Sequence, residues 1–384
     1  MATAVSLYGV DMILVVGGGP AGAACAIGLA QAGRAVMLIE RETAAIDKVC
    51  GEFVSAETQI YLTRLGLPTA ALGGHEISML RLVHAERTIT APLPFAGVGL
   101  RRRGLDEALL ALAVKNGVQV RRGQAVRRIQ TSGGISVEAG DEVLRPDLLV
   151  LASGKHEIRG AMRPTRASRF VGLKSYFALT AAQHAALANH VELILFRGGY
   201  AGLQMVEGGL ANLSLLVDKA EARNKWPALL ASLQRATPHL ALRLDQAIDQ
   251  LPNPLAIAGM PFGFIHGPQE DDPPNLFRLG DQAAVIQSFT GDGLAIALHS
   301  AALAVSRIIA GERPQAYYKQ LRADIGGQIL RAAMLHRALT TPLLGPTLLA
   351  GAALWPATLT RAAAWTRVPD TAMARCATYA TMRC

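Results

Sequence analysis

The chain has 384 residues, of which 51% are hydrophobic and 17% charged, and its formal net charge is +9. This length and apolar content are enough for two domains or one large one. The cysteines lack the spacing of metal ligands or of a disulfide framework, so no metal is expected and a reducing cytoplasm fits best. The positive charge comes without a nucleic-acid motif or interleaved aromatic residues, so no nucleic-acid partner is expected.

Residues 12–40 have the pattern of a βαβ unit. An apolar run at 12–16 predicts a buried parallel strand, and the turn that follows, Gly-Gly-Gly-Pro-Ala-Gly at 17–22, matches G-x-G-x-x-G. An alanine-rich helix and a second apolar strand at 35–39 come next, and this strand ends at Glu40. The unit therefore predicts a dinucleotide site.

Each part of this turn has a separate physical role. Gly17 permits the tight turn from strand to helix, Gly19 lets the backbone approach a pyrophosphate, and Gly22 lets the helix pack closely on the strand. The pyrophosphate is then held by the free N–H groups and the positive dipole end of the helix. Glu40 can accept hydrogen bonds from a ribose diol.

The next segments alternate between helix and strand patterns. We expect strands of a second sheet in 77–100 and a helix over about 105–116. A hairpin is expected over 124–145, turning at Gly133-Gly134, and a buried parallel strand over 147–152.

The second half of the chain changes character. Short strand patterns over 168–218 predict an antiparallel meander, which is typical of a substrate domain. Residues 224–250 read as helical, and 276–279 as a short buried strand. A long helix is expected from about residue 293 to 310, and residues 314–384 read as helical.

A second glycine-rich segment, GDQAAVIQSFTGDGLAIAL, spans residues 280–298. It predicts a strand that ends in Gly280-Asp281 and a helix that begins at the Gly291–Leu294 turn. A helix N-terminus can stabilise the negative charge that a reduced flavin carries at one edge of its ring. By itself this segment reads as two ordinary turns.

Taken together, the two glycine-rich segments resemble those of the flavoprotein superfamily of aromatic hydroxylases, geranylgeranyl reductases and flavin-dependent halogenases. Arg102 stands four residues before Asp106, as in the R-x-x-[LF]-D segment of that superfamily. The resemblance extends over roughly residues 10–310 and implies FAD as the cofactor. The residues that it places at FAD are Gly17, Gly19, Pro20, Ala21, Gly22, Glu40, Arg41, Cys50, Gly51, Arg102, Gly154, Asp281, Gly291, Asp292, Gly293 and Leu294.

The expected fold is α/β, with a Rossmann-like FAD-binding domain, an inserted antiparallel-sheet substrate domain and a C-terminal helical region. The FAD-binding domain is expected in three parts, 1–76, 101–160 and 256–312. The substrate domain is expected in two parts, 77–100 and 161–255, and the helical region spans 313–384.

Two segments bear on how the flavin is used. Hydroxylases of the superfamily carry an Asp-Gly pair after the strand at 147–152, but here Ser153 replaces the acid and only Gly154 and Arg159 match. The resemblance implies NAD(P)H as the electron donor, and Ser153 leaves that choice open. Cys50-Gly51 resembles a segment of the geranylgeranyl reductase branch that lies beside the flavin, which makes Cys50 the candidate residue near the ring.

Three activities stay open at this stage. A monooxygenase would hydroxylate a lipophilic aromatic or polyketide-type substrate through a flavin C4a-hydroperoxide, and this is the activity that we favour. The alternatives are a C=C reductase of the geranylgeranyl reductase type and a flavin electron carrier without a substrate. Halogenation is disfavoured because the three tryptophans are isolated and do not form W-x-W-x-I-P.

The substrate side offers two further indications. Three histidines, His75, His84 and His266, fall in segments that could line it, although none can be assigned as a base. Residues 342–360 are nearly uncharged but interrupted by prolines, which predicts a buried or interfacial hairpin. We therefore expect a lipophilic small-molecule substrate and a cytoplasmic protein with peripheral membrane contact through the C-terminal region.

Overall fold

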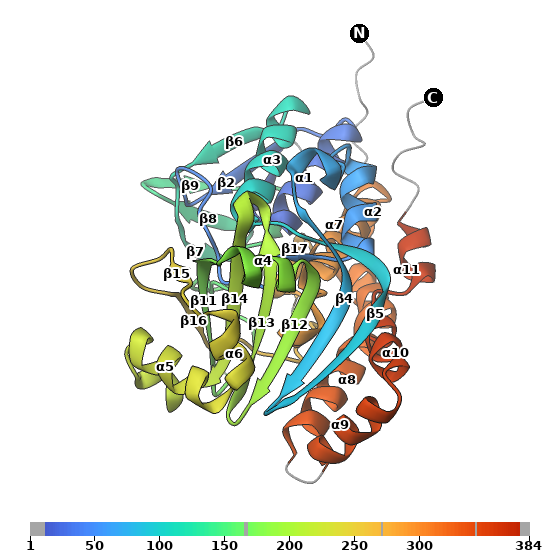
Figure 1. Cartoon of the computed structure of the whole chain (residues 1–384). Helices are drawn as coiled ribbons and strands as arrows, with labels where there is room; N and C mark the ends of the chain where they lie inside the picture. Colours follow the sequence, from blue (N-terminus) through green and yellow to red (C-terminus); the bar gives the residue numbers. More distant parts are fainter. Residues whose placement is uncertain (1–11, 165–167, 270–271, 342–343, 377–384) are drawn as a thin grey trace.

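The computed structural model describes residues 12–164, 168–269, 272–341 and 344–376, and it combines two large sheets with flanking helices (Figure 1). The expected α/β fold is confirmed. The first sheet has five parallel strands. In spatial order they are β17 (Leu276–Arg278), β10 (Leu148–Leu151), β1 (Ile13–Val16), β2 (Val36–Glu40) and β6 (Gln119–Arg122).

Both faces of this sheet are buried, which explains why its strands are continuous apolar runs. Ile13 and Val15 of β1 face a core to which three neighbouring helices contribute, among others, whereas Leu14 and Val16 face a small antiparallel sheet. The helices are α1 (Pro20–Gln31), α3 (Arg102–Lys115) and α7 (Gly293–Ile309). The small sheet consists of β7 (Val126–Gln130), β8 (Ser136–Ala139) and β9 (Glu142–Leu144).

The second large sheet has nine strands. In spatial order they are β15 (Ile248–Asp249), β11 (Phe170–Ala178), β14 (Leu210–Asp218), β13 (Gly199–Val206), β12 (Asn189–Phe196), β4 (His75–His84), β5 (Arg87–Gly99) and β3 (Phe53–Val54), while β16 (Leu255–Ala258) pairs with β11. An antiparallel meander is expected over residues 168–218. In this segment only β12, β13 and β14 are consecutive strands that pair with one another. Helix α4 (Ala181–Leu187) separates β11 from β12, and β12 pairs with β4 in parallel.

Three shorter helices differ from the expected pattern or add to it. The helical stretch expected over 224–250 divides into α5 (Trp226–Ala236) and α6 (Pro238–Arg243), because Pro238 cannot continue α5, and it ends in strand β15. Helix α2 (Ala56–Leu65) follows β3. The 3-10 turns are η1 (Thr69–Leu72), η2 (Glu207–Gly209), η3 (Glu221–Arg223), η4 (Gly280–Gln282) and η5 (Ser288–Thr290).

The C-terminal region is helical, as expected. It consists of α8 (Pro314–Thr340), α9 (Leu344–Leu354), α10 (Ala357–Trp365) and α11 (Asp370–Arg375). Figure 1 shows α8, α9 and α10 along the side of the nine-stranded sheet where β4 and β5 lie. Pro342, at the start of the expected hairpin, lies outside the described residues. None of the described helices combines the length with the apolar character that a membrane span requires.

The close packing of α1 on β1 generates a testable prediction. A Cβ atom at Gly22 would lie 1.9 Å from the carbonyl oxygen of Gly17, so Gly22→Ala must displace backbone. We expect it to lower the free energy of unfolding by about 1 to 3 kcal/mol, measured by urea denaturation. Gly351→Ala on α9 is the control, because nothing lies within 4 Å of its Cβ position, and it should instead stabilise by about 0.5 to 1 kcal/mol. Equal effects of the two variants would contradict the packing argument.

Candidate cofactor and substrate site

The N-terminus of α1 presents free backbone donors beside an arginine. Gly19 is the N-cap residue, and no side chain caps the helix, so the first-turn N–H groups stay open to a ligand. A Cβ atom at Gly19 would lie 3.5 Å from a terminal nitrogen of Arg102. Gly17, with φ of +105°, lies against the backbone of Ala152, where a Cβ atom would not fit. Open donors and a nearby guanidinium are the groups that a pyrophosphate requires.

Glu40 lies at the end of β2 beside this turn. One of its carboxylate oxygens accepts a hydrogen bond from the Gly18 N–H at 2.6 Å, and the other accepts from the Glu42 N–H at 3.1 Å. A cleft opens next to the carboxylate and is lined by Gly18, Glu40, Glu42, Ala44, Ala45, Ile46, Lys48, Asp106, Leu110 and Arg122. Arg41 lies at the surface and pairs with Glu42. The carboxylate is thus held in place beside the glycine-rich turn, at the edge of a hollow of about 10 Å³.

Arg102 is oriented by its own helix. Its guanidinium forms two hydrogen bonds, of 2.8 and 2.9 Å, with the carboxylate of Asp106 one turn later, and Lys48 pairs with the same carboxylate at 2.9 Å. Burial alone would raise the pKa of Asp106, but the two cations outweigh it and hold that pKa below its ordinary range. The predicted pair of Arg102 and Asp106 is therefore a fixed ion pair, and Lys48 is a partner that the sequence did not indicate.

The loop at 48–52 is held by side chains of the second sheet. Asn212 donates hydrogen bonds to the carbonyls of Cys50 and Gly51, at 3.2 and 2.8 Å, and Ser214 donates to the Cys50 carbonyl at 3.0 Å. Gly51 is exposed, and nothing lies within 4 Å of its Cβ position. The segment that carries Cys50 thus has one side fixed on the sheet and another side open.

Glu52 anchors this loop in the interior. Its carboxylate is fully buried, pairs with Lys174 at 2.6 Å and accepts hydrogen bonds from the Tyr176 hydroxyl at 2.8 and 3.0 Å. It also accepts a hydrogen bond from the Arg102 N–H at 2.8 Å. Burial raises the pKa of Glu52, although Lys174 opposes the shift. No motif in the sequence marks Lys174. The feature that distinguishes it is a charge inside a strand that is otherwise largely apolar.

The second glycine-rich segment packs against the first. A Cβ atom at Gly280 would lie 3.1 Å from the Ala21 side chain, so η4 brings Asp281 next to the start of α1. Gln282 donates a hydrogen bond of 2.8 Å to the carbonyl of Gly154, which ties the loop after β10 to the same place. Lys155 in that loop donates to the Val49 carbonyl. Three loops separated in sequence therefore meet at the carboxyl edge of the parallel sheet.

The turn at 291–294 presents backbone rather than side chains to this edge. Gly291 has φ of +68°, and Gly293 is exposed with nothing within 4 Å of its Cβ position. By contrast, the Leu294 side chain is part of the core. Such a turn can offer the N–H groups of the α7 N-terminus to a flat ring.

The side chain of Asp292 points into the protein. It is fully buried, pairs with Arg367 at 3.2 Å and accepts hydrogen bonds from Gln328 and Ser55. Arg367 also donates to the Thr290 carbonyl. Burial raises the pKa of Asp292 to about 6, despite the lowering effect of Arg367. A residue from beyond α10 therefore holds the turn that precedes α7.

An aromatic cluster lies beside the same turn. We define it as Phe170, Tyr200, Phe289 and His336. The His336 ring is stacked on Phe289, with 6.3 Å between centroids, and meets Phe170 and Tyr200 edge-on at 5.9 and 6.2 Å. The Tyr200 hydroxyl is 2.6 Å from the Ser288 hydroxyl and accepts a hydrogen bond from the Phe289 N–H. Burial lowers the pKa of His336 and raises that of Tyr200 to about 12, so both are neutral near pH 7.

The histidines considered from the sequence lie elsewhere. The His75 ring contacts His184 at the start of β4, and His84 ends the same strand. His266 is hydrogen-bonded to Asp272 at 3.0 Å and packs on Tyr318. The histidine beside the turn is instead His336, which no sequence motif marked. The described residues contain no cluster of three or more side chains suited to a metal ion.

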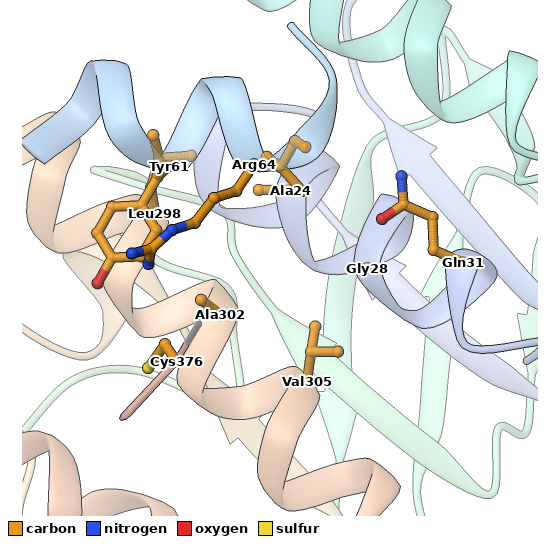
Figure 2. A pocket seen from close by; sticks show the side chains of 10 residues that line it. Ala24, Gly28, Gln31, Tyr61, Arg64, Leu298, Ala302, Val305 and Cys376 are labelled. Atoms are coloured by element: carbon orange, nitrogen blue, oxygen red, sulfur yellow. The ribbon is translucent and has the colours of Figure 1, made fainter. Parts of the chain in front are cut away.

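A separate small cavity lies between α1, α2 and α7 (Figure 2). Its volume is about 40 Å³, and its lining includes Gly28, Tyr61, Arg64 and Cys376. That volume can hold a few water molecules but no cofactor or organic substrate. Tyr61 belongs to a buried hydrogen-bonded chain that connects α2, α7 and α8. We therefore assign this cavity a packing role.

The buried pair of Glu52 and Lys174 leads to a second prediction. Lys174→Met leaves the Glu52 carboxylate without its cation and should lower the free energy of unfolding by about 3 to 5 kcal/mol. Adding Glu52→Gln should recover part of that loss in urea denaturation. Arg121→Met is the control, since it breaks an exposed pair with Glu142 and should cost less than about 1 kcal/mol. A similar loss for the two single variants would count against the role of Lys174.

The pKa of Asp292 leads to a third prediction. As the pH falls through about 6, the folded protein takes up a proton at Asp292 that the unfolded chain, with an ordinary aspartate pKa near 4, does not bind. The wild type should thus gain about 1 kcal/mol relative to Asp292→Asn between about pH 7 and about pH 5. Urea denaturation at both pH values measures this, with Asp141→Asn at an exposed turn as the control. No pH-dependent difference between wild type and Asp292→Asn would contradict the assignment.

Comparisons with known proteins agree with this geometry. A family model described as an FAD binding domain matches residues 10–159. Digeranylgeranylglycerophospholipid reductase 2 of Methanopyrus kandleri is 29% identical over 301 residues, covering 73% of this chain and 72% of the relative. Menaquinone reductase of Mycolicibacterium smegmatis is 25% identical over 319 residues, covering 78% and 76%.

The fold is also that of a solved flavoenzyme. The flavin-dependent brominase Bmp2 superposes with a TM-score of 0.76 at 17% identity and covers 92% of this chain and 93% of its own. This likeness concerns the fold alone. Together with the two glycine-rich turns, the family model over residues 10–159 and the reductase relatives indicate an FAD-dependent oxidoreductase.

Proposed function

We propose that this FAD-dependent oxidoreductase is a monooxygenase that hydroxylates the ring of a lipophilic aromatic or polyketide-type substrate, with NAD(P)H as the electron donor. The observation that carries the proposal is the aromatic cluster of Phe170, Tyr200, Phe289 and His336 beside the Gly291–Leu294 turn. It combines flat apolar rings with two neutral polar groups, as a phenolic ring requires.

The residues around the first turn fit the ADP half of FAD. The open N–H groups of α1 and the guanidinium of Arg102 would hold the pyrophosphate, and Glu40 would hold the ribose. Asp281, next to the start of α1, would bind hydroxyls near the diphosphate. Bound FAD supplies the electrons and the site at which O2 is activated.

The backbone near Gly293 and the loop that carries Cys50 would flank the flavin ring. Both present open space where a Cβ atom would otherwise stand. The α7 N-terminus would stabilise negative charge on the reduced ring through its dipole and its free N–H groups. The side chains would thus bind and orient the cofactor, while backbone N–H groups would donate hydrogen bonds to the flavin ring.

The aromatic cluster would position the substrate. Edge-on and stacked contacts between aromatic rings contribute about 0.5 to 1.5 kcal/mol each beyond their buried area. The neutral imidazole of His336 can accept the proton of a substrate hydroxyl, which increases the electron density of the ring that receives oxygen. The lowered pKa of His336 keeps this imidazole unprotonated near neutral pH.

A C=C reductase is the second candidate. It is favoured by the sequence relatives, two proteins named as reductases whose similarity extends over about three quarters of the chain and so includes the second sheet. A reductase would transfer hydride to a double bond and would need no oxygen. A pure electron carrier is disfavoured because it requires only an exposed flavin edge and not a nine-stranded second sheet.

Oxygen dependence distinguishes these activities. Purified FAD-loaded enzyme would be reduced with NADH or NADPH and mixed with a long-chain alkylphenol or with geranylgeraniol, with and without isotope-labelled O2. The monooxygenase predicts one labelled oxygen atom in the alkylphenol product and no product without O2. A product reduced by two hydrogens under anaerobic conditions would overturn it in favour of the reductase.

The same assay tests the role of His336. His336→Gln should lower kcat/KM for the alkylphenol by about 100-fold or more and remove the ionisation limb on the acidic side of the pH profile. His84→Gln at the end of β4 is the matched control and should leave both unchanged. An unaltered pH profile in His336→Gln would show that this imidazole accepts no proton in the reaction.

A further inference from the structure

The C-terminal helices carry an unusual concentration of exposed apolar side chains. Thirteen large apolar side chains are exposed among the described residues, and six of them fall between residues 330 and 365. The six are Leu330, Met334, Leu348, Leu354, Trp355 and Trp365. Exposed apolar residues are ordinary when scattered, but a local concentration of them marks an interaction surface.

The corner between α9 and α10 is the most apolar part of this surface. Leu354 is 90% exposed and Trp355 is 55% exposed, and the residues from Ala353 to Ala357 are all exposed and uncharged. The opposite side of the same helices packs on the second sheet, where Leu349, Ala352 and Leu359 are buried against β4 and β5. One side of α9 and α10 is therefore fixed on the sheet, whereas Leu354 and Trp355 on the other side are exposed.

The charged residues in this part of the sequence are of one sign. From residue 325 to residue 369 the sequence contains four arginines and neither aspartate nor glutamate. The Arg361 guanidinium lies over the Trp355 ring, 4.7 Å from its centroid, and the Arg331 guanidinium lies over Trp365 at 5.6 Å. Tryptophan and arginine pairs of this kind suit the boundary between acyl chains and phosphate groups.

We propose that the exposed side of α9 and α10 is a docking surface for an anionic phospholipid bilayer. Leu354 and Trp355 enter the boundary of the acyl chains, while Arg331, Arg337 and Arg361 contact lipid phosphates. The helices have 11 and 9 residues, too short to span a bilayer, so they lie in the plane of its surface. This inference holds for any of the activities considered above.

Vesicle binding tests the proposal on the full-length FAD-loaded protein. The probes are vesicles of phosphatidylcholine alone and of equal parts phosphatidylcholine and phosphatidylglycerol, with binding measured by flotation. The wild type should bind the anionic vesicles, and Leu354→Ser with Trp355→Ser should weaken binding at least ~10-fold. Arg337→Gln and Arg361→Gln should each weaken it by about fivefold, and added salt should reproduce their effect.

Leu242→Ser is the matched control, because Leu242 is also 55% exposed but lies on α6, away from this surface, and it should bind as the wild type does. Circular dichroism and bound FAD verify that each variant is folded. Equal binding by the wild type and the Leu354-Trp355 variant, or no binding by either, would overturn the proposal. So would a monomer in the variant but a dimer in the wild type without vesicle binding, because a second copy would then cover this surface.

Discussion

The buried carboxylate of Glu52 is the constraint on which the geometry of the site depends. It connects three parts of the molecule: the loop that carries Cys50, the start of α3 at Arg102, and the second sheet through Lys174 and Tyr176. An unpaired carboxylate in the interior would be very unfavourable, so the three parts must come together when the protein folds. Residues expected at the flavin ring and at the pyrophosphate are thereby placed relative to one another by one side chain.

The main-chain conformation of Glu52 supports this role. Its φ is +59°, a value that residues with a side chain adopt rarely, and its carbonyl accepts hydrogen bonds from Gln204 at 2.8 Å and from the Leu100 N–H at 3.0 Å. The Cys50-Gly51 segment that precedes it is held on the same sheet by Asn212 and Ser214. The sheet therefore determines both the position of the loop and the direction in which its open side faces.

The parts of the fold that sequence predicts are those with local causes. The βαβ unit is predictable because its turn needs glycine at specified positions: a Cβ atom at Gly22 would lie 1.9 Å from a backbone oxygen. Helix α3 and strand β10 follow from periodicity and from an uninterrupted apolar run. The parallel pairing of β12 with β4 could not be predicted, because alternation shows which side chains face a core but not which strand lies alongside.

The same distinction applies to the site. Gly17, Glu40 and Arg102 belong to short motifs whose spacing reflects a local geometry, and the structure brings them together at the α1 N-terminus. The aromatic cluster has no such signal, since Phe170, Tyr200, Phe289 and His336 come from four segments that only the tertiary fold unites. His336 lies on a helix whose pattern in the sequence indicates packing alone, so no motif distinguishes it from the other eight histidines.

Arg367 connects the proposed membrane surface to the proposed flavin site. It lies two residues beyond Trp365, which is exposed at the end of α10, yet its guanidinium is buried and holds both Asp292 and the Thr290 carbonyl. Gln328 of α8 contacts the same aspartate, so two C-terminal elements support the turn that precedes α7. Arg367 therefore connects the end of α10 to this turn through a buried ion pair. A bilayer that contacts α10 would therefore contact a helix whose end supports the proposed flavin and substrate site. A lipophilic substrate would then come from the bilayer at one end of this short segment and react at the site near the other end.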